Sequence, residues 1–596
     1  MPITKISNFV CTHSKLIFSW RFVVFSLTAS LGAGFIFFVL KGGLTFTSLP
    51  LSVYLVWLCV IILSSLFGFL SSPVEKKLCT ALSRAMCDLR NTEAESLIQQ
   101  ASQLFYVLPR GRIELDRLKA SFYETQGDLL KAYKILHSLF RFPLLPTERK
   151  NIDIDLLQLL LAGGNYKAVK QGMARLQKGK LSSEQSLKLV LMRAELHIID
   201  NQLQTAKDLL EDQLLNTQST LSMQVSLLHT LAVAETHQQN YQNAAACYRK
   251  AWSIQKNLKN SFAQAEITVG NLVLNYAKQG EVTKIQGLLD ELEGLAQPNA
   301  VDQQLAIHNI KLSLARQLSD REAVVDIYRQ ASEQLLPKLS GESKFFYRVH
   351  ELRMHWNDEI DFEEALIRSR KAMTQRPAMS ALKQLHSLKE VIGTVIQAMK
   401  KLGPRQDLII YHNWLIVEFQ RLQPELDQLL DEIPPTLPGP KDALLRLKVE
   451  SIKYGLAFHQ HIPKIFFDEL FQLLGEQKSL WHGMHNTEGQ LEALILTLDE
   501  YTAFKQQLAA PQFENDYKAH AFIALDEAEQ LLVEVQQNLG YSGYLVGMAY
   551  YCYQLNTKKE QAKLWLEAYD KSKQSLNHNA IWLRQQYVEA KAWVSS

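Results

Sequence analysis

The chain has 596 residues, and its 64 lysine and arginine residues against 61 aspartate and glutamate residues give a formal net charge of +3. The whole excess lies within residues 1–75, which hold four basic residues and one acidic residue, so the remainder is neutral overall. A nucleic-acid-binding protein normally carries a basic excess or stripe, so this balance argues against that class. The six cysteines are scattered without a CxxC pair, which indicates neither a disulfide framework nor a zinc site.

Two apolar segments open the chain. Residues 22–40 and 49–70 contain no charged side chain. Each is about 20 residues long, which matches the hydrocarbon core of a bilayer, about 30 Å thick. We therefore expect residues 1–75 to form a two-helix transmembrane hairpin. A cleaved signal peptide is the alternative for the first segment, because basic residues precede it and small residues occupy 28–33.

The basic residues predict how such a hairpin is oriented. They precede the first segment and follow the second, and the positive-inside rule then places both ends in the cytoplasm. We expect a multi-pass inner-membrane protein whose N-terminus and large C-terminal body face the cytoplasm. Ala29 with Ala33, and Ser30 with Gly34, are small residues four apart, which favour close helix packing within the hairpin or in a homo-oligomer.

The rest of the chain repeats. Glycine and proline are scarce, and no stretch alternates with the period of two that strands need. A small or branched residue that would begin the second helix of a hairpin recurs at spacings of 37 to 42 residues. Regular recurrence of this kind is typical of a solenoid, so we expect an all-α superhelical array. The recurring positions are Ala132, Val169, Ala206, Ala244, Ile285, Ala323 and Ala365.

The clearest unit reads LHTLAVAETHQQNYQNAAACYRKAW and contains Leu231, Ala232, Tyr241, Ala244, Tyr248 and Ala251. It resembles the tetratricopeptide repeat. The resemblance implies that small residues let the two helices of a unit cross closely, while aromatic residues fill the gap to the next unit. The usual period of that family is about 34 residues, so the spacing here implies longer helices. Other matching positions are Ala120, Tyr123, Gly127, Ala132, Ala194, Ala206, Ala365 and Pro377.

A proline-rich segment interrupts the helical pattern at 431–440, where four prolines occur. Proline lacks the N–H that a helix needs, so no helix is expected to run through the segment. We expect a linker there, between a repeat array over 76–432 and a second helical block over 441–596. Trp481 and Trp565 in the second block are interpreted as core or capping residues.

The resemblance also implies a binding surface. In tetratricopeptide arrays the first helices of successive units line a groove that holds a peptide. The corresponding positions here are polar and nearly uncharged, and they lack the Lys/Asn/Arg set that holds the C-terminal carboxylate of a chaperone. We expect protein partners bound through hydrogen bonds and apolar anchors, with a solenoid that has no peptide ligand as the alternative. The predicted groove positions are Ser226, His229, Thr230, Val233, Thr236, His237, Ile267, Asn271, Leu274 and Lys278.

Motifs for chemistry are missing from the sequence. It has no phosphate-binding loop, HExxH, GxSxG or kinase signature, so we expect neither an enzyme nor a cofactor, with an unrecognised catalytic block within 441–596 as the alternative. Imidazole suits zinc, copper or haem iron, but no acidic or thiol ligand stands at matching spacing near the clustered histidines. We interpret these histidines as surface or capping residues: His459, His461, His482 and His485.

The layout of two apolar segments followed at once by repeats resembles the HemY-type inner-membrane proteins of Gram-negative bacteria. That resemblance implies a short N-terminal hairpin with cytoplasmic tetratricopeptide repeats and an association with tetrapyrrole synthesis, although this chain is much longer. The expected function is a membrane-anchored scaffold that binds other proteins at the cytoplasmic face of a bacterial inner membrane. A haem-pathway protein, or a subunit of an envelope-assembly or secretion complex, are the alternatives.

Overall fold

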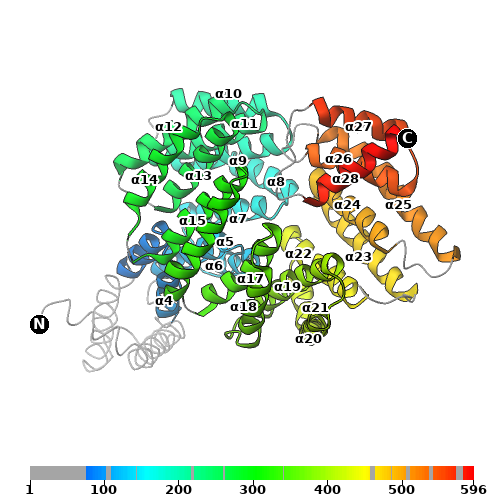
Figure 1. Cartoon of the computed structure of the whole chain (residues 1–596). Helices are drawn as coiled ribbons and strands as arrows, with labels where there is room; N and C mark the ends of the chain where they lie inside the picture. The colour runs from blue at the N-terminus through cyan, green and yellow to red at the C-terminus, as the bar shows by residue number, and fades with distance from the viewer. Residues whose placement is uncertain are drawn as a thin grey trace, which may run out of the picture. The chain divides into compact units, whose positions relative to one another are not determined.

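The computed structural model describes residues 76–596 except 103–108, 143, 217–219, 259–261, 298, 340, 457–463, 485, 505–510, 536–540 and 572–580. Within this described part, every regular element is a helix (Figure 1). Packing divides the chain into two compact units. The smaller falls within 1–159 with 260–264, and the larger comprises 160–259 with 265–596.

The smaller unit is built from a helical hairpin and its neighbours. α5 and α6 pack against each other around Ala120, Ala132 and Leu136, all of which are buried. Arg117 Nε on α5 donates to Asp155 Oδ2 on α7 at 2.6 Å. The helices are α4 (Asn91–Ser102), α5 (Pro109–Thr125), α6 (Leu129–Leu139) and α7 (Pro146–Ala162), whose last residues belong to the larger unit.

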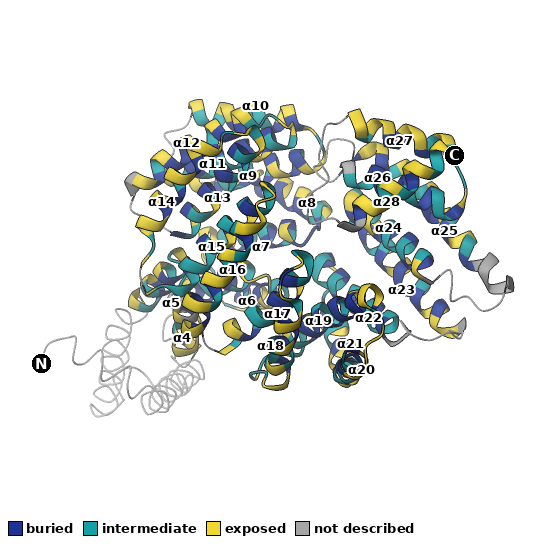
Figure 2. Cartoon of the chain, viewed as in Figure 1, coloured by how far each residue is buried: buried dark blue, intermediate teal, exposed yellow. Residues whose placement is uncertain are grey.

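The larger unit continues the pattern of paired helices, and its helices carry both buried and exposed residues (Figure 2). Its helices are α8 (Tyr166–Leu176), α9 (Ser183–Ile199), α10 (Leu203–Asn216), α11 (Leu221–His237), α12 (Tyr241–Leu258), α13 (Phe262–Gln279), α14 (Ile285–Leu295), α15 (Val301–Gln317), α16 (Arg321–Gln330), α17 (Gly341–Asn357), α18 (Phe362–Thr374), α19 (Ala381–Leu402), α20 (Gln406–Arg421), α21 (Gln423–Glu432), α22 (Pro438–Leu456), α23 (Lys464–Gly483), α24 (Thr487–Phe504), α25 (Pro511–Glu534), α26 (Tyr541–Leu555), α27 (Lys559–Lys571) and α28 (Ile581–Ser595). Successive hairpins thus stack as a solenoid-like array.

The hairpin turns share one way of ending the first helix. A residue in the left-handed region follows that helix, and the next N–H bonds to the carbonyl five residues back, which is a Schellman cap. After Gly127, with φ of 78°, the N–H of Asp128 donates to the Tyr123 carbonyl at 2.8 Å. The Asp128 side chain then accepts from the N–H of Lys131 at 3.0 Å and caps α6. The same left-handed turn occurs at Gly164, Asn201, Gln239, Gly280 and Ser319.

The recurring small or branched residue occupies the fourth position of the second helix. Ala132, Ala206 and Ala244 stand there in α6, α10 and α12, and all three are fully buried. Two positions differ: Ile285 is the first residue of α14, after a short 3-10 turn over Val282–Lys284, and Ala323 precedes the buried fourth residue of α16, Val324, because α16 begins at Arg321. The predicted position in α16 is therefore one residue early, a rotation of about 100° around the helix.

Several positions of the tetratricopeptide-like pattern are buried, whereas Tyr123 and Tyr241 are only partly buried and Gly127 is exposed. Ala194, Leu231, Ala232, Tyr248 and Ala251 are all buried between neighbouring helices. The helix that precedes Pro377, α18, ends at Thr374, as the position of the proline predicts. The fold is an all-α array of helical hairpins.

The proline-rich segment is a short connection. α21 ends at Glu432 and α22 begins at Pro438. The N–H groups in the first turn of a helix have no partner within the helix, so proline loses no hydrogen bond there. Leu437 in the connection is fully buried. The division into blocks at 431–440 stays a prediction, since the compact units separate near residue 159 instead.

A contact within the larger unit joins segments 271 residues apart. Asn165 Nδ2, in the turn before α8, donates to the Thr436 carbonyl at 2.9 Å. The N–H of Gly439 donates to the Gly163 carbonyl at 2.9 Å. A Cβ on Gly439 would lie 3.0 Å from that carbonyl oxygen, a tight contact that favours glycine at this position.

Trp481 completes this contact, which we call the Trp481 clasp (163–166, 434–439, Trp481 and 486–489). The indole is buried, with 7% of its surface exposed. A Cβ on Gly164 would lie 2.7 Å from its Cζ3 atom, and one on Gly489 would lie 2.6 Å from its Cδ2 atom. The ring is therefore held between two glycines. The interpretation of Trp481 as a core residue is confirmed.

The predicted location in a bacterial inner membrane is contradicted. Across the part of the chain that the structure describes, no helix combines the length and apolar character that a bilayer crossing requires. The two predicted spans, 22–40 and 49–70, and the small-residue faces predicted for homo-oligomerisation lie outside the described residues.

Candidate protein-binding groove

Three helices of the larger unit lie next to one another, with α19 packed against α17 and against α22 (Figure 1). Between them is a groove with a volume of about 1080 Å³, which we call the α19 groove. Gln585 of α28 also borders it. The lining residues are His350, Arg353, Trp356, Asn357, Glu359, His386, Lys389, Glu390, Gly393, Thr394, Gln397, Lys400, Lys401, Glu450, Tyr454 and Gln585.

The floor of the groove is one face of α19. Its groove residues recur every three or four positions, from Lys389 through Gly393 and Gln397 to Lys400, which is a stripe along one side of a helix. Leu388 and Val395 lie on the other side and are fully buried. The same helix thus packs through one face and lines the groove with the other.

α22 is fixed against this floor by Tyr454. The Tyr454 hydroxyl donates to the Lys389 carbonyl at 3.3 Å. A Cβ on Gly393 would lie 3.4 Å from that hydroxyl, so the small residue leaves room for the tyrosine. Burial raises the pKa of Tyr454, and the neighbouring Glu450 raises it further, so the phenol stays a hydrogen-bond donor at neutral pH.

The acidic side chains of the groove are recessed and already paired. Glu390 has 13% of its side chain exposed, and its Oε1 atom lies 2.7 Å from His350 Nδ1. Glu450 has 19% exposed and faces Lys389 Nζ at 3.9 Å. Glu359 stands at the rim, where a hydrogen bond from Lys401 Nζ at 2.7 Å lowers the pKa of its carboxyl group.

The cationic side chains are more exposed than Glu390 and Glu450, although Glu359 at the rim is 54% exposed. Arg353 has 63% of its side chain exposed and reaches Glu390 only at 3.7 Å. Lys401 has 59% exposed, and its Nζ atom lies 5.5 Å from the ring centre of Trp356. Lys400 is also exposed, and no acidic partner lies within ion-pair distance of it among the described residues. The accessible charge in the groove is therefore positive.

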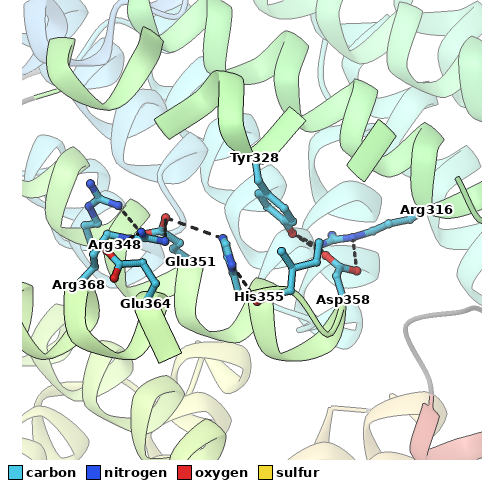
Figure 3. A network of polar contacts seen from close by, with 9 residues as sticks. Arg316, Tyr328, Arg348, Glu351, His355, Asp358, Glu364 and Arg368 are labelled. Atoms are coloured by element: carbon cyan, nitrogen blue, oxygen red, sulfur yellow. Dashed lines mark hydrogen bonds and ion pairs between the residues drawn. The ribbon is translucent and has the colours of Figure 1, made fainter. Parts of the chain in front are cut away.

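A buried network of polar side chains fixes the position of α17 (Figure 3). Glu351 is 2% exposed and pairs with Arg348 Nη1 at 2.6 Å and with Arg368 Nη2 of α18 at 3.1 Å. Removal of the buried carboxylate, or of one of its guanidinium partners, is costly because the group that remains is a charge without compensation. The pairs therefore fix the rotation of α17 about its axis.

A second part of the network reaches α15 and α16 (Figure 3). Arg316 Nη2 donates to Asp358 Oδ2 at 2.7 Å, and the Tyr328 hydroxyl donates to the same oxygen at 2.6 Å. His355 packs on the Tyr328 ring, with ring centres 4.9 Å apart. Burial lowers the pKa of His355, so its ring is neutral at pH 7. These contacts position the face of α17 that carries Arg353 and Trp356.

The predicted groove positions lie on α11 and α13, away from the residues that line the α19 groove. A hydrogen bond joins the two helices, with His229 Nε2 2.6 Å from Thr268 Oγ1. Burial lowers the pKa of His229 to about 4. The hydroxyl of Thr230 donates to the Ser226 carbonyl and that of Thr236 to the Ala232 carbonyl, so both bond to their own helix.

Other predicted positions on this surface remain accessible. Val233 and Ile267 are exposed, whereas Asn271 and Leu274 are partly covered. Lys278 Nζ lies 4.8 Å from the ring centre of Tyr241, and burial of the amine lowers its pKa. Burial likewise lowers the pKa of His237. Whether these positions bind a partner stays a prediction.

The histidines named as metal candidates do not form a described site. His482 Nδ1 lies 3.2 Å from Gln490 Oε1, whereas His459, His461 and His485 lie outside the described residues. Elsewhere in the described chain, no group of three or more His, Cys, Asp or Glu side chains is arranged to hold a metal ion.

Sequence reasoning missed the α19 groove. The available signal was the segment HSLKEVIGTVIQAMKKL, in which Lys389 and Lys400 flank Gly393 on one face of a first helix. A small residue between long cationic ones is the pattern of a floor that leaves space above it. The pattern does not show that α17 and α22 complete the walls.

No family model matches the chain, and no curated protein matches it either. Among solved structures, it is similar to a chain of the APC/C hetero-tetramer Cut9-Hcn1, with 13% identity and a TM-score of 0.23 over 80% of this chain and 96% of that one. It is also similar to a chain of Naa15/Naa10 bound to HypK-THB, with 10% identity and a TM-score of 0.25 over 87% and 97%. A circular tandem repeat protein gives 12% identity and a TM-score of 0.14 over 87% and 97%. Likeness at this level says nothing about what this chain binds, and its own helix pairs show an all-α array of helical hairpins.

Proposed function

We propose that this chain is a protein-binding scaffold that holds a segment of a partner protein in the α19 groove. The proposal is supported by one observation above the others: a continuous groove that crosses α17, α19 and α22. In helical repeat arrays, first helices that stand side by side present such extended surfaces to peptides. The chain would act by binding and not by chemistry.

The residue types that line the groove favour a peptide over a small molecule. Sites for small ligands have volumes of about 300–1,000 Å³ and carry only a few polar groups. The α19 groove, at about 1080 Å³, lies at the upper end of that range, but most of its lining residues are polar or charged. Trp356 and Tyr454 supply aromatic surface at its sides, which suits the side chains of a bound segment.

The surface of α11 and α13 is a second candidate. Its exposed Val233 and Ile267 favour an apolar contact with a partner. The hydrogen-bonding part of the predicted recognition is less well supported, because the hydroxyls of Thr230 and Thr236 bond to their own helix. We therefore place the α19 groove first.

Site-specific photo-crosslinking tests the proposal. A photoreactive phenylalanine derivative would replace Gln397 in the groove, Ile267 on the second surface, or Gln420, an exposed glutamine of α20 that does not border the groove. We expect one partner to crosslink at position 397 and not at position 420. Crosslinking of that partner at position 267 alone would favour the second surface, and equal crosslinking at all three would refute a defined site.

A further inference from the structure

The charges of the α19 groove are not evenly accessible. Its three carboxylates are each paired with a basic or phenolic neighbour, and the two that lie inside the groove have less than a fifth of their side chains exposed. Arg353 and Lys401 each have more than half exposed, and so has Glu359, which is paired with Lys401 at the rim. Inside the groove, an occupant therefore meets cations before it meets Glu390 or Glu450.

The cations also retain the larger unused bonding capacity. Arg353 and Lys389 reach their acidic neighbours only at 3.7 and 3.9 Å, longer than a charge-assisted hydrogen bond. Lys400 and His386 have no acidic side chain in ion-pair contact within the described part of the chain. The guanidinium of Arg353 on α17 and the ammonium groups of Lys389 and Lys400 on the floor present hydrogen-bond donors that carboxylates can accept.

We infer that the α19 groove selects an acidic segment of a partner protein, whose carboxylates pair with Arg353, Lys389 and Lys400. This inference rests on the proposed function, because it names the chemistry of the occupant of the same groove. Charge complementarity carries it: Glu390 and Glu450 are recessed and already have partners, while Arg353 and Lys400 are exposed and attract carboxylates.

Selection from a displayed library of random twelve-residue peptides on the full-length chain tests the inference. Enriched peptides would then be titrated against the wild-type chain, against Gln397→Trp, and against the pair Lys389→Gln and Lys400→Gln. The matched control for charge is the pair Lys371→Gln and Lys563→Gln, which removes two exposed lysines from α18 and α27, outside the groove.

We expect acidic peptides that lose binding with Gln397→Trp, bind about tenfold more weakly to the Lys389 and Lys400 variant, and keep their affinity for the control. Groove-dependent peptides that are neutral or basic would overturn the inference and leave the proposed function standing. A single-stranded RNA of equal charge that binds as tightly would also overturn it. Peptides unaffected by Gln397→Trp would refute the proposed function itself, and the inference with it.

Discussion

Substitution of Gly164 by alanine tests the Trp481 clasp. Gly164 has φ of 79°, and its added Cβ would lie 2.7 Å from Cζ3 and 3.1 Å from Cη2 of Trp481. A non-glycine residue in the left-handed region costs about 1–2 kcal/mol. Overpacking of a filled core adds about 1–3 kcal/mol. We expect both effects to lower the local stability of the Trp481 clasp.

Gly280 offers a matched control. It ends α13 with φ of 74°, but a Cβ built there meets nothing within 4 Å. Gly280→Ala therefore carries only the cost of the left-handed backbone. The difference between the two variants isolates the collision with the indole, for which we expect about 1–3 kcal/mol.

Hydrogen exchange followed by mass spectrometry measures this difference locally. The N–H of Gly439 donates to Gly163, so peptides that contain Gly439 report opening of the clasp. Each 1.4 kcal/mol of lost local stability speeds exchange about tenfold. Gly164→Ala should raise exchange there by about tenfold or more, and Gly280→Ala should leave it unchanged.

A smaller ring at position 481 should relieve the collision with the added Cβ, which provides the last part of the test. Trp481→Phe removes the benzo ring that carries Cζ3 and Cη2, so Gly164→Ala should cost less in that background than in the wild type. Equal costs in the two backgrounds, or unchanged exchange at Gly439 in Gly164→Ala, would refute the packing that we describe.

Three further predictions follow from the other sites. Burial lowers the pKa of His229 from 6.5 to about 4, so the neutral ring stabilises the fold fully above pH 6.5, and this stabilisation is lost as the pH falls to 4. Over that range the free energy of unfolding of the wild type, measured with urea, should fall by roughly 3 kcal/mol more than that of His229→Gln. Glu351→Gln removes the buried partner of Arg348 and Arg368 and should cost about 3 kcal/mol, and a cost below about 1 kcal/mol in the same assay would contradict the role assigned to the pair. Ala244→Leu overpacks the fully buried fourth position of α12 and should lower the melting temperature, whereas an unchanged value would mean that this position tolerates bulk.

The repeat array was predictable from the sequence because its determinants are local. A left-handed turn and a small fourth residue recur within each hairpin, so spacing alone places Ala132, Ala206 and Ala244 in the core. Ala323 was placed one residue early because both Ala323 and Val324 satisfy the spacing, and only the start of α16 at Arg321 decides between them.

The site was less predictable because it depends on distant contacts. The predicted positions on α11 include hydroxyls that the helix backbone already uses, as at Thr230, which no spacing rule detects. The Trp481 clasp joins residues 271 positions apart, and no local pattern links Asn165 to Thr436. The position of Lys389 and Lys400 on a groove likewise depends on where α17 and α22 pack.

The affinity of the crosslinked partner segment for the chain tests the central claim most directly. Fluorescence anisotropy would give the dissociation constant of that labelled segment for the wild type, for Gln397→Trp and for the control Gln420→Trp. If the α19 groove is the binding site, the bulky indole at position 397 should weaken binding more than tenfold, while the control should match the wild type. Equal dissociation constants for all three chains would contradict the claim that a partner occupies the groove.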